Sequence, residues 1–219
     1  MGTIHRNLRG LTFRSCSSED LETCSKLAED AWPMSPRLGQ RALAPREMQA
    51  WVHLSLLWSD WAELACESQE VVGLLFGKIF KHKKDRPTAS WVFTNLMLFA
   101  RFILGRYGGP PRNLRFLWNF LLTETKVAIN QPRADAEIVL LIVHSSRQKE
   151  GIGKVLLDRF ISAARQGAQI TVRVYSGGLS NEWRFYERYG FKRVGIFYDN
   201  LASYFASRYT NGFFYLLTL

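Results

Sequence analysis

The sequence predicts a single α/β domain in which strands alternate with amphipathic helices. Its 219 residues, 47% of them hydrophobic, are enough to bury a full core. Along the chain, apolar residues recur with the two-residue period of strands in some segments and with helical spacing in others. The predicted order is strand, helix, helix, two strands, inserted helices, then strand, helix, strand, helix and two strands. We expect residues 1–219 to form one domain, with residues 79–135 as the insertion.

The first third of the chain predicts a strand, two helices and a β-hairpin. After a strand around residues 11–14, Ser17 and Asp20 have the spacing of a helix start, and apolar residues follow at helical intervals. A second helix is expected near Pro45, because proline is favoured in the first turn. The segment "WAELACESQEVVGLLFGKIF" indicates two strands joined by the polar turn "ESQE".

Residues 79–135 are predicted to form a basic, aromatic-rich helical hairpin. The segments "PTASWVFTNLMLFARFILGRY" and "RNLRFLWNFLLTETKVAINQ" both show helical spacing, and "GGPP" separates them. Between Lys78 and Asp135 the chain has eleven Lys and Arg residues against three Asp and Glu residues, which is most of the net charge of +10. The most apolar window contains Asn95 and Arg101 and is shorter than a membrane span.

The remaining elements follow a buried strand. The run "AEIVLLIV" from Ala136 is typical of a strand covered on both faces. The next helix ends at Gly167 and has five apolar residues on one side: Leu156, Leu157, Phe160, Ile161 and Ala164. Then come the strand "QITVRVY", a short helix that ends at Gly190, and the strands "KRVGIFY" and "GFFYLLTL".

The stretch "RQKEGIGKVLLDRF" places two glycines where the buried strand gives way to a helix. The first N–H groups of a helix lack partners and the helix dipole adds positive potential, so such a turn can bind a phosphate. Gly151 and Gly153 leave the backbone accessible, and Lys149 and Lys154 add charge. The spacing fits neither a P-loop nor a dinucleotide-binding turn. On the glycines alone, a tight turn without a ligand is an equal alternative.

Two motifs resemble those of the GNAT acyltransferase superfamily. Residues 148–153, "QKEGIG", match its Q/R-x-x-G-x-G/A signature, and "FYERYGF" from Phe185 resembles its F-Y-E-x-x-G-F segment. The resemblance extends from the N-terminus to about Lys78 and from Ala136 to the end. It implies an α/β fold with a mixed, mostly antiparallel central sheet flanked by helices. The helical insertion would precede the strand that binds the coenzyme.

The resemblance implies acetyl-CoA as cosubstrate, held where two parallel strands splay apart. It places the diphosphate on six residues: Gln148, Lys149, Gly151, Ile152, Gly153 and Lys154. It pairs the pantetheine arm with the backbone of three more: Leu141, Ile142 and Val143. Two departures stand out. Glu150 occupies a position where the family usually has Lys or Arg, and the family's asparagine is replaced by Leu179. Asn181 is a candidate substitute, although a helix cap is the alternative.

The implied reaction is direct transfer of an acetyl group to a primary amine in a ternary complex. A lysine-like amine, with a pKa of about 10.4, is mostly protonated at neutral pH, so a base is needed. Glu137 resembles the base of the histone-acetylating branch; a solvated residue at the strand end is the alternative. Tyr186 corresponds to the family's usual general acid, and the alternative is a core aromatic residue. His144 is expected to be a polar residue at the strand end.

The sequence contains fewer signals for the protein's cellular location and its binding partners. Cys16, Cys24 and Cys66 have neither CxxC spacing nor nearby histidines, so we expect no metal site, no disulfide and a reducing cytoplasm. The aromatic residues of the insertion could cover an acceptor pocket, form a homodimer interface, rest on a membrane surface or form a small core. No nucleic-acid-binding motif accompanies the charge. The alternative functions are a non-catalytic acyl-CoA-binding module and an adaptor that binds a membrane or partner through the insertion.

Overall fold

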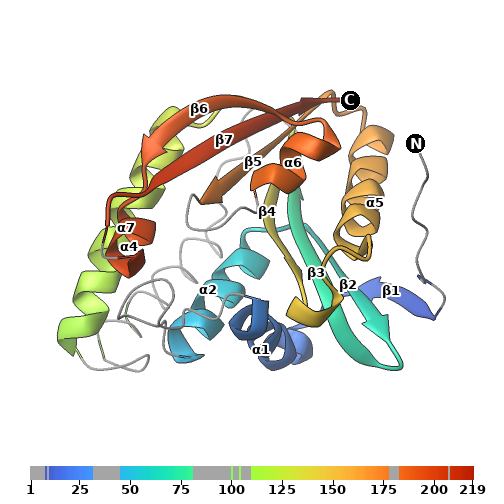
Figure 1. Ribbon diagram of the computed structural model, residues 1–219, viewed down its shortest axis with the longest axis horizontal. Coiled ribbons are helices and arrows are strands. Elements are labelled where there is room, and N and C mark those ends of the chain that lie inside the picture. The colour runs from blue at the N-terminus through green and yellow to red at the C-terminus, as the bar shows by residue number, and fades with distance from the viewer. Residues whose placement is uncertain are drawn as a thin grey trace.

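A computed structural model describes residues 8, 10–31, 45–80, 100, 104, 110–177, 183–206 and 208–219. In this part of the chain, seven strands form one sheet in the order β1-β2-β3-β4-β5-β7-β6 (Figure 1). Every neighbouring pair is antiparallel except β4 and β5, which are parallel. The predicted mixed, mostly antiparallel sheet is therefore confirmed. The strands are β1 (Leu11–Ser15), β2 (Trp61–Glu67), β3 (Glu70–Ile79), β4 (Ala136–Val143), β5 (Thr171–Gly177), β6 (Lys192–Tyr198) and β7 (Asn211–Thr218).

Helices cover both faces of the sheet (Figure 1). They are α1 (Leu21–Ala31), α2 (Pro45–Leu57), α4 (Pro110–Asn130), α5 (Ile152–Gln166), α6 (Trp183–Tyr189) and α7 (Asn200–Ala206), with 3-10 turns η1 (Ser18–Asp20) and η3 (Ser145–Arg147). One core cluster joins α5 and α6 to the sheet, and we call this side the α5 face. A second cluster joins α1 and α2 to the other side, the α1 face. Helix α4 lies beside α7 and the end of β6.

The predicted start of the first helix and the predicted hairpin turn both form. The carboxylate of Asp20 accepts a hydrogen bond from the backbone N–H of Ser17 at 2.9 Å and is held by Arg14. At the "ESQE" turn, Ser68 and Gln69 have φ values of 47° and 77°. Two successive left-handed residues give the twist that a two-residue hairpin needs.

Strand β4 contains a β-bulge that the sequence did not predict. Phe76 of β3 pairs with Leu140, and the next residue, Gly77, pairs with Ile138, so Val139 is the extra residue. The bulge reverses which side chains reach which face. Ile138 lies in the α5-face core, whereas Leu140 lies in the α1-face core. The expectation that β4 is buried on both faces is only partly correct, because every second residue is only half-buried.

The predicted helical hairpin can be followed only in its second half. That half is α4, whereas most of the first predicted helix lies outside the described residues. Helix α7, between the last two strands, was not predicted. Its start has a recognisable signal, because the Asp199 carboxylate accepts the backbone N–H of Ala202 at 2.9 Å. Among the described residues, no helix is both long and apolar enough to cross a membrane.

Candidate active site

Strands β4 and β5 stop pairing soon after they begin. The paired residues are Ala136 with Val172, Glu137 with Arg173, and Ile138 with Val174. Beyond them the two described strands are no longer hydrogen-bonded to each other, although β5 remains paired with β7 as far as Gly177. We call this divergence the β4–β5 split. It leaves the second half of β4 without a strand on one edge.

Backbone groups of β4 face the split at alternate residues. The N–H of His144 donates to the carbonyl of Val72 on β3 at 3.0 Å. Successive residues of a strand direct their backbone groups to opposite edges, so Ile142 faces β3 while Leu141 and Val143 face the split. Of the three residues predicted to pair with the cosubstrate, two therefore present backbone groups at the unpaired edge. The backbone of Ile142 is used by the sheet.

The glycine-rich turn lies at the end of this edge. Lys149 and Gly151 adopt left-handed conformations, with φ values of 69° and 98°. The first bond of α5 runs from the N–H of Val155 to the carbonyl of Gly151 at 3.0 Å, so the N–H groups at positions 152–154 have no acceptor within the helix. A Cβ atom on Gly153 would lie 3.4 Å from Val143 and 3.7 Å from Phe185. The turn, the strand edge and α6 therefore meet at Gly153.

The acidic residue in the turn forms an ion pair with an arginine. Nε of Arg147 donates to Oε2 of Glu150 at 2.8 Å, and the same guanidinium forms an ion pair with Glu67 on β2. The carboxylate that departs from the family pattern is thus engaged by a neighbouring cation. Lys154 forms an exposed ion pair with Asp158 at 2.7 Å, and Gln148 donates to the carbonyl of Val143 at 3.3 Å.

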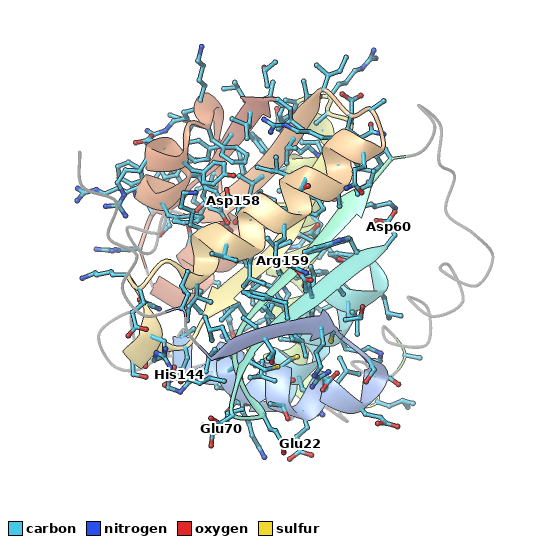
Figure 2. All side chains as sticks on the ribbon, turned by 90° about the vertical axis from the view of Figure 1, so that its right-hand side faces the viewer. Glu22, Asp60, Glu70, His144, Asp158 and Arg159 are labelled. Carbon is cyan, nitrogen blue, oxygen red and sulfur yellow. The ribbon has the colours of Figure 1, made fainter. Side chains whose placement is uncertain are left out.

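The turn that leads into the glycines is fixed by α1. Asp30 accepts the backbone N–H of Ser145 at 2.7 Å and its hydroxyl at 2.9 Å. Nδ1 of His144 lies 2.9 Å from the hydroxyl of Ser146, so His144 acts as a cap of η3. Figure 2 shows His144 beside the N-terminal end of α5, with Arg159 further along that helix. Arg159 holds α5 to β2 through Glu63 at 2.5 Å.

Tyr186 lies on the inner side of α6 and is 8% exposed. Its ring packs edge-on against Phe185 and Phe191, with centroid separations of 5.3 and 5.6 Å. Spacing alone left open which side of this helix faces the core. The structure buries Tyr186 and leaves Trp183 and Tyr189 partly exposed. Asn181, the candidate substitute for the family's asparagine, lies outside the described residues.

Glu137, the predicted base, forms a close ion pair. Its Oε2 accepts from Nη2 of Arg173 at 2.6 Å and from Nε at 3.1 Å. Arg173 also donates to the carbonyl of Pro132 at 3.0 Å. The pair joins β4 to β5 at the point where the two strands begin to separate.

Two further carboxylates lie near this pair and were not singled out from the sequence. Asp199, 1% exposed, accepts hydrogen bonds from the hydroxyls of Tyr175 and Thr123. Glu124 of α4 lies near enough to Glu137 and Asp199 for their charges to act on it. Burial of the Glu124 carboxyl, with smaller effects from those two charges, raises its pKa to about 7. Glu124 has no signal in the sequence. Asp199 has only the signal of a helix cap, because its hydroxyl partners Thr123 and Tyr175 lie on other elements.

Other candidate places in the described structure are less suited to the reaction. One hollow of about 410 Å³ is lined by Asp158, Arg165 and Tyr189, and another of about 370 Å³ by Asp60, Trp61 and Gln169. Both lie away from the β4–β5 split. Within the described ranges, no group of three or more His, Cys, Asp or Glu side chains could hold a metal ion.

Comparison with known proteins agrees with this geometry. Residues 122–193 match the family model of the acetyltransferase (GNAT) domain. This part of the chain is therefore similar to the GNAT domain. The match includes the second part of α4, the split, the glycine-rich turn and α6. No curated protein sequence matches the chain.

Solved structures show the same GNAT fold over nearly the whole chain. A GNAT-family protein from Desulfovibrio desulfuricans superposes with a TM-score of 0.56 and 14% identity, covering 95% of this chain and 98% of its own. The PaiA N-acetyltransferase from Thermoplasma acidophilum, in complex with coenzyme A, gives 0.55 and 15%, covering 95% and 99%. The yncA protein of Salmonella typhimurium, with acetyl-CoA, gives 0.53 and 17%, covering 96% and 95%. At such identities the likeness establishes the fold.

Proposed function

We propose that the chain is an acetyl-CoA-dependent N-acetyltransferase that transfers the acetyl group directly to a primary amine in a ternary complex. The observation that carries this proposal is the β4–β5 split with the Gly151 turn at its end. An unpaired strand edge suits an extended arm with amide groups, and a helix N-terminus behind glycines suits a diphosphate. The GNAT domain match and the coenzyme complexes of PaiA and yncA support the same assignment.

The chain's own residues would hold the cosubstrate in two places. The backbone of Leu141 and Val143 would pair with the pantetheine arm. The free N–H groups at the start of α5 would bind the diphosphate, with Lys149 and Lys154 adding positive charge and Gln148 lining the turn. A free carboxylate at Glu150 would repel the diphosphate and would favour a non-catalytic acyl-CoA-binding module. Because Glu150 is ion-paired with Arg147, this repulsion is reduced.

Tyr186 is the proposed proton donor. When the amine attacks the thioester carbon, the C–N bond forms and the C–S bond breaks, so the departing thiolate needs a proton. Tyr186 lies on α6, next to Phe185, which reaches the glycine-rich turn. The proposed base is a carboxylate on the α1 face, where Glu137 was the candidate from the sequence. The roles predicted for the basic insertion, as dimer, membrane or partner surface, stay predictions.

The function is tested by measuring thiol release from acetyl-CoA with a panel of amines, and by identifying the acetylated product by mass spectrometry. We expect amine-dependent release in the wild type and a fall in kcat of about ten- to ten-thousand-fold in Tyr186→Phe, with unchanged coenzyme affinity. Binding of acetyl-CoA without turnover would favour the acyl-CoA-binding module. Full activity of Tyr186→Phe would assign Tyr186 to the core alone.

A further inference from the structure

The end of the split where β4 and β5 still pair presents a polar surface on the α1 face. Ile138 and Val174 point into the α5-face core. Their strand neighbours therefore point the other way, which places Glu137 on β4 and Arg173 and Tyr175 on β5 toward the α1 face. A reacting group carried along the edge of β4 toward Ile138 would arrive beside these side chains.

Specific polar contacts fix helix α4 beside Asp199, the hydrogen-bond partner of Tyr175. The hydroxyl of Thr123 donates to Oδ1 of Asp199 at 3.1 Å and accepts the backbone N–H of Leu201 at 2.9 Å. One turn later, Nζ of Lys126 donates to Oδ1 of Asn200 at 2.7 Å. These contacts hold both sides of the turn that carries Glu124. The position of Glu124 is thus determined by the packing of α4 on α7 and the end of β6.

Of the three neighbouring carboxylates, only Glu124 has no donor within the described part of the chain. Glu137 forms an ion pair with the guanidinium of Arg173. Asp199 accepts hydrogen bonds from two hydroxyls and a backbone N–H. No hydrogen bond or ion pair of Glu124 is formed with any described residue, and its side chain is half-buried. The charged form of a half-buried carboxylate without a donor is unfavourable, and either a proton or a cationic ligand relieves this cost.

The neighbouring cations and hydroxyls are engaged elsewhere. Arg173 is divided between Glu137 and the carbonyl of Pro132. Lys126 contacts Asn200 and stacks over the ring of Tyr198 at 4.6 Å. The hydroxyl of Tyr175 donates to Asp199, and the pKa of Tyr175 is raised well above its usual value by burial and by that carboxylate, so it stays a neutral donor. None of these described groups offsets the charge of Glu124.

We propose that Glu124 of α4, rather than Glu137, binds the ammonium form of the acceptor and takes its proton. This inference rests on the proposed acetyltransferase function and names the base that it requires. The carboxylate accepts one proton from the ammonium group. The neutral amine then attacks the thioester carbon, and the second amine proton leaves with the thiolate through the proposed donor Tyr186. Glu124 afterwards releases its proton to solvent. Glu137 is a positioning residue, because it holds Arg173 and the closed end of the split.

The same surface indicates the class of acceptor. Glu124 lies close to two carboxylates that already have their own partners, so the surroundings favour a cation and disfavour an acceptor with a carboxylate beside its amine. Diamines, polyamines and lysine side chains fit this requirement. Free α-amino acids that react at the α-amine do not.

The test compares the wild type with Glu124→Gln, using acetyl-CoA with putrescine, N-acetyl-lysine methylamide and glycine as probes. The wild type should acetylate the first two amines faster than glycine, and its kcat/KM should rise through about pH 7. Glu124→Gln should lower kcat/KM by about ten- to ten-thousand-fold and remove this rise, while acetyl-CoA affinity stays unchanged. The matched control is Glu22→Gln, an exposed glutamate on α1 that pairs with Lys26, which should leave activity unchanged. Glu124→Asp, which keeps a carboxylate, should retain the pH-dependent rise at a lower rate.

The outcomes separate the two proposals. An active wild type with an equally active Glu124→Gln variant and the same pH profile would overturn the role of Glu124 and leave the acetyltransferase function standing. Faster acetylation of glycine than of putrescine would overturn the acceptor class. A wild type that acetylates none of a wider amine panel would overturn the proposed function itself. Thermal unfolding of each variant establishes that lost activity does not come from lost folding.

Discussion

The raised pKa of Glu124 predicts a pH-dependent change in stability. The ordinary value is 4.5 and burial raises it to about 7, so the folded state binds the proton more tightly than the unfolded state. The free energy of unfolding of the wild type should therefore fall, relative to Glu124→Gln, as the pH rises from 4.5 to 7, and then stay level. We expect Glu124→Gln to gain about 1–3 kcal/mol relative to the wild type between pH 5 and 8. Urea unfolding at both pH values measures this, and a difference independent of pH would show that the Glu124 carboxyl is solvated.

Glu124 and Glu137 show what the sequence could predict about single residues and what it could not. Glu137 is a candidate because it resembles the base of the histone-acetylating branch, at the start of a core strand. Its ion pair with Arg173, 36 residues later, depends on the register of two parallel strands and could not be predicted. Glu124 had no signal, because one acidic residue on an amphipathic helix gives no indication of burial. Tyr186 was correctly placed on a helix, although only the structure shows which side of the helix is buried.

Several elements were predictable because local signals and tertiary structure agree. The Ser17 and Asp20 pair, the "ESQE" turn and the glycines after α5 and α6 each specify a boundary by backbone chemistry. Two features escaped prediction. The bulge at Val139 lies within a continuous apolar run, so the spacing of apolar residues cannot reveal it. Helix α7 has only seven residues and lies between two strands. The bulge matters for the site because it allows Ile138 and Leu140 to point to opposite faces.

The packing of α5 on β3 depends on a missing side chain. A Cβ atom on Gly77 would lie 2.4 Å from the ring of Phe160, so the ring occupies the space that any other residue would need. Gly77→Ala should lower the free energy of unfolding by about 1–3 kcal/mol through overpacking. The control is Gly177→Ala on β5, where the nearest atoms lie at 3.7 and 3.8 Å. Equal stability of both variants in urea unfolding would contradict the tight contact between Phe160 and β3.

The site is assembled from segments that are distant along the chain. The turn at Gly151 follows β4 and α6 comes after β5, yet the turn, β4 and α6 meet at Gly153. Helix α4 precedes β4 and lies beside α7 and the end of β6 (Figure 1). The sequence predicted the turn and the parallel strands through the resemblance of its motifs. It could not predict that a helix outside the resemblance would bring a carboxylate to the same place, because the position of α4 is set by contacts with α7 and β6.

Calorimetric titration with acetyl-CoA measures binding of the coenzyme at the β4–β5 split, which every proposed step requires. The wild type should bind acetyl-CoA. Gly153→Leu should weaken binding at least about tenfold, or about 1.4 kcal/mol, because the leucine would project toward Val143 and Phe185 where the turn meets the strand edge. Gly167→Ala, at the opposite end of the same helix, should bind as the wild type does. Absence of binding in the wild type, or unchanged affinity in Gly153→Leu, would show that the coenzyme does not bind at the turn beside the β4–β5 split.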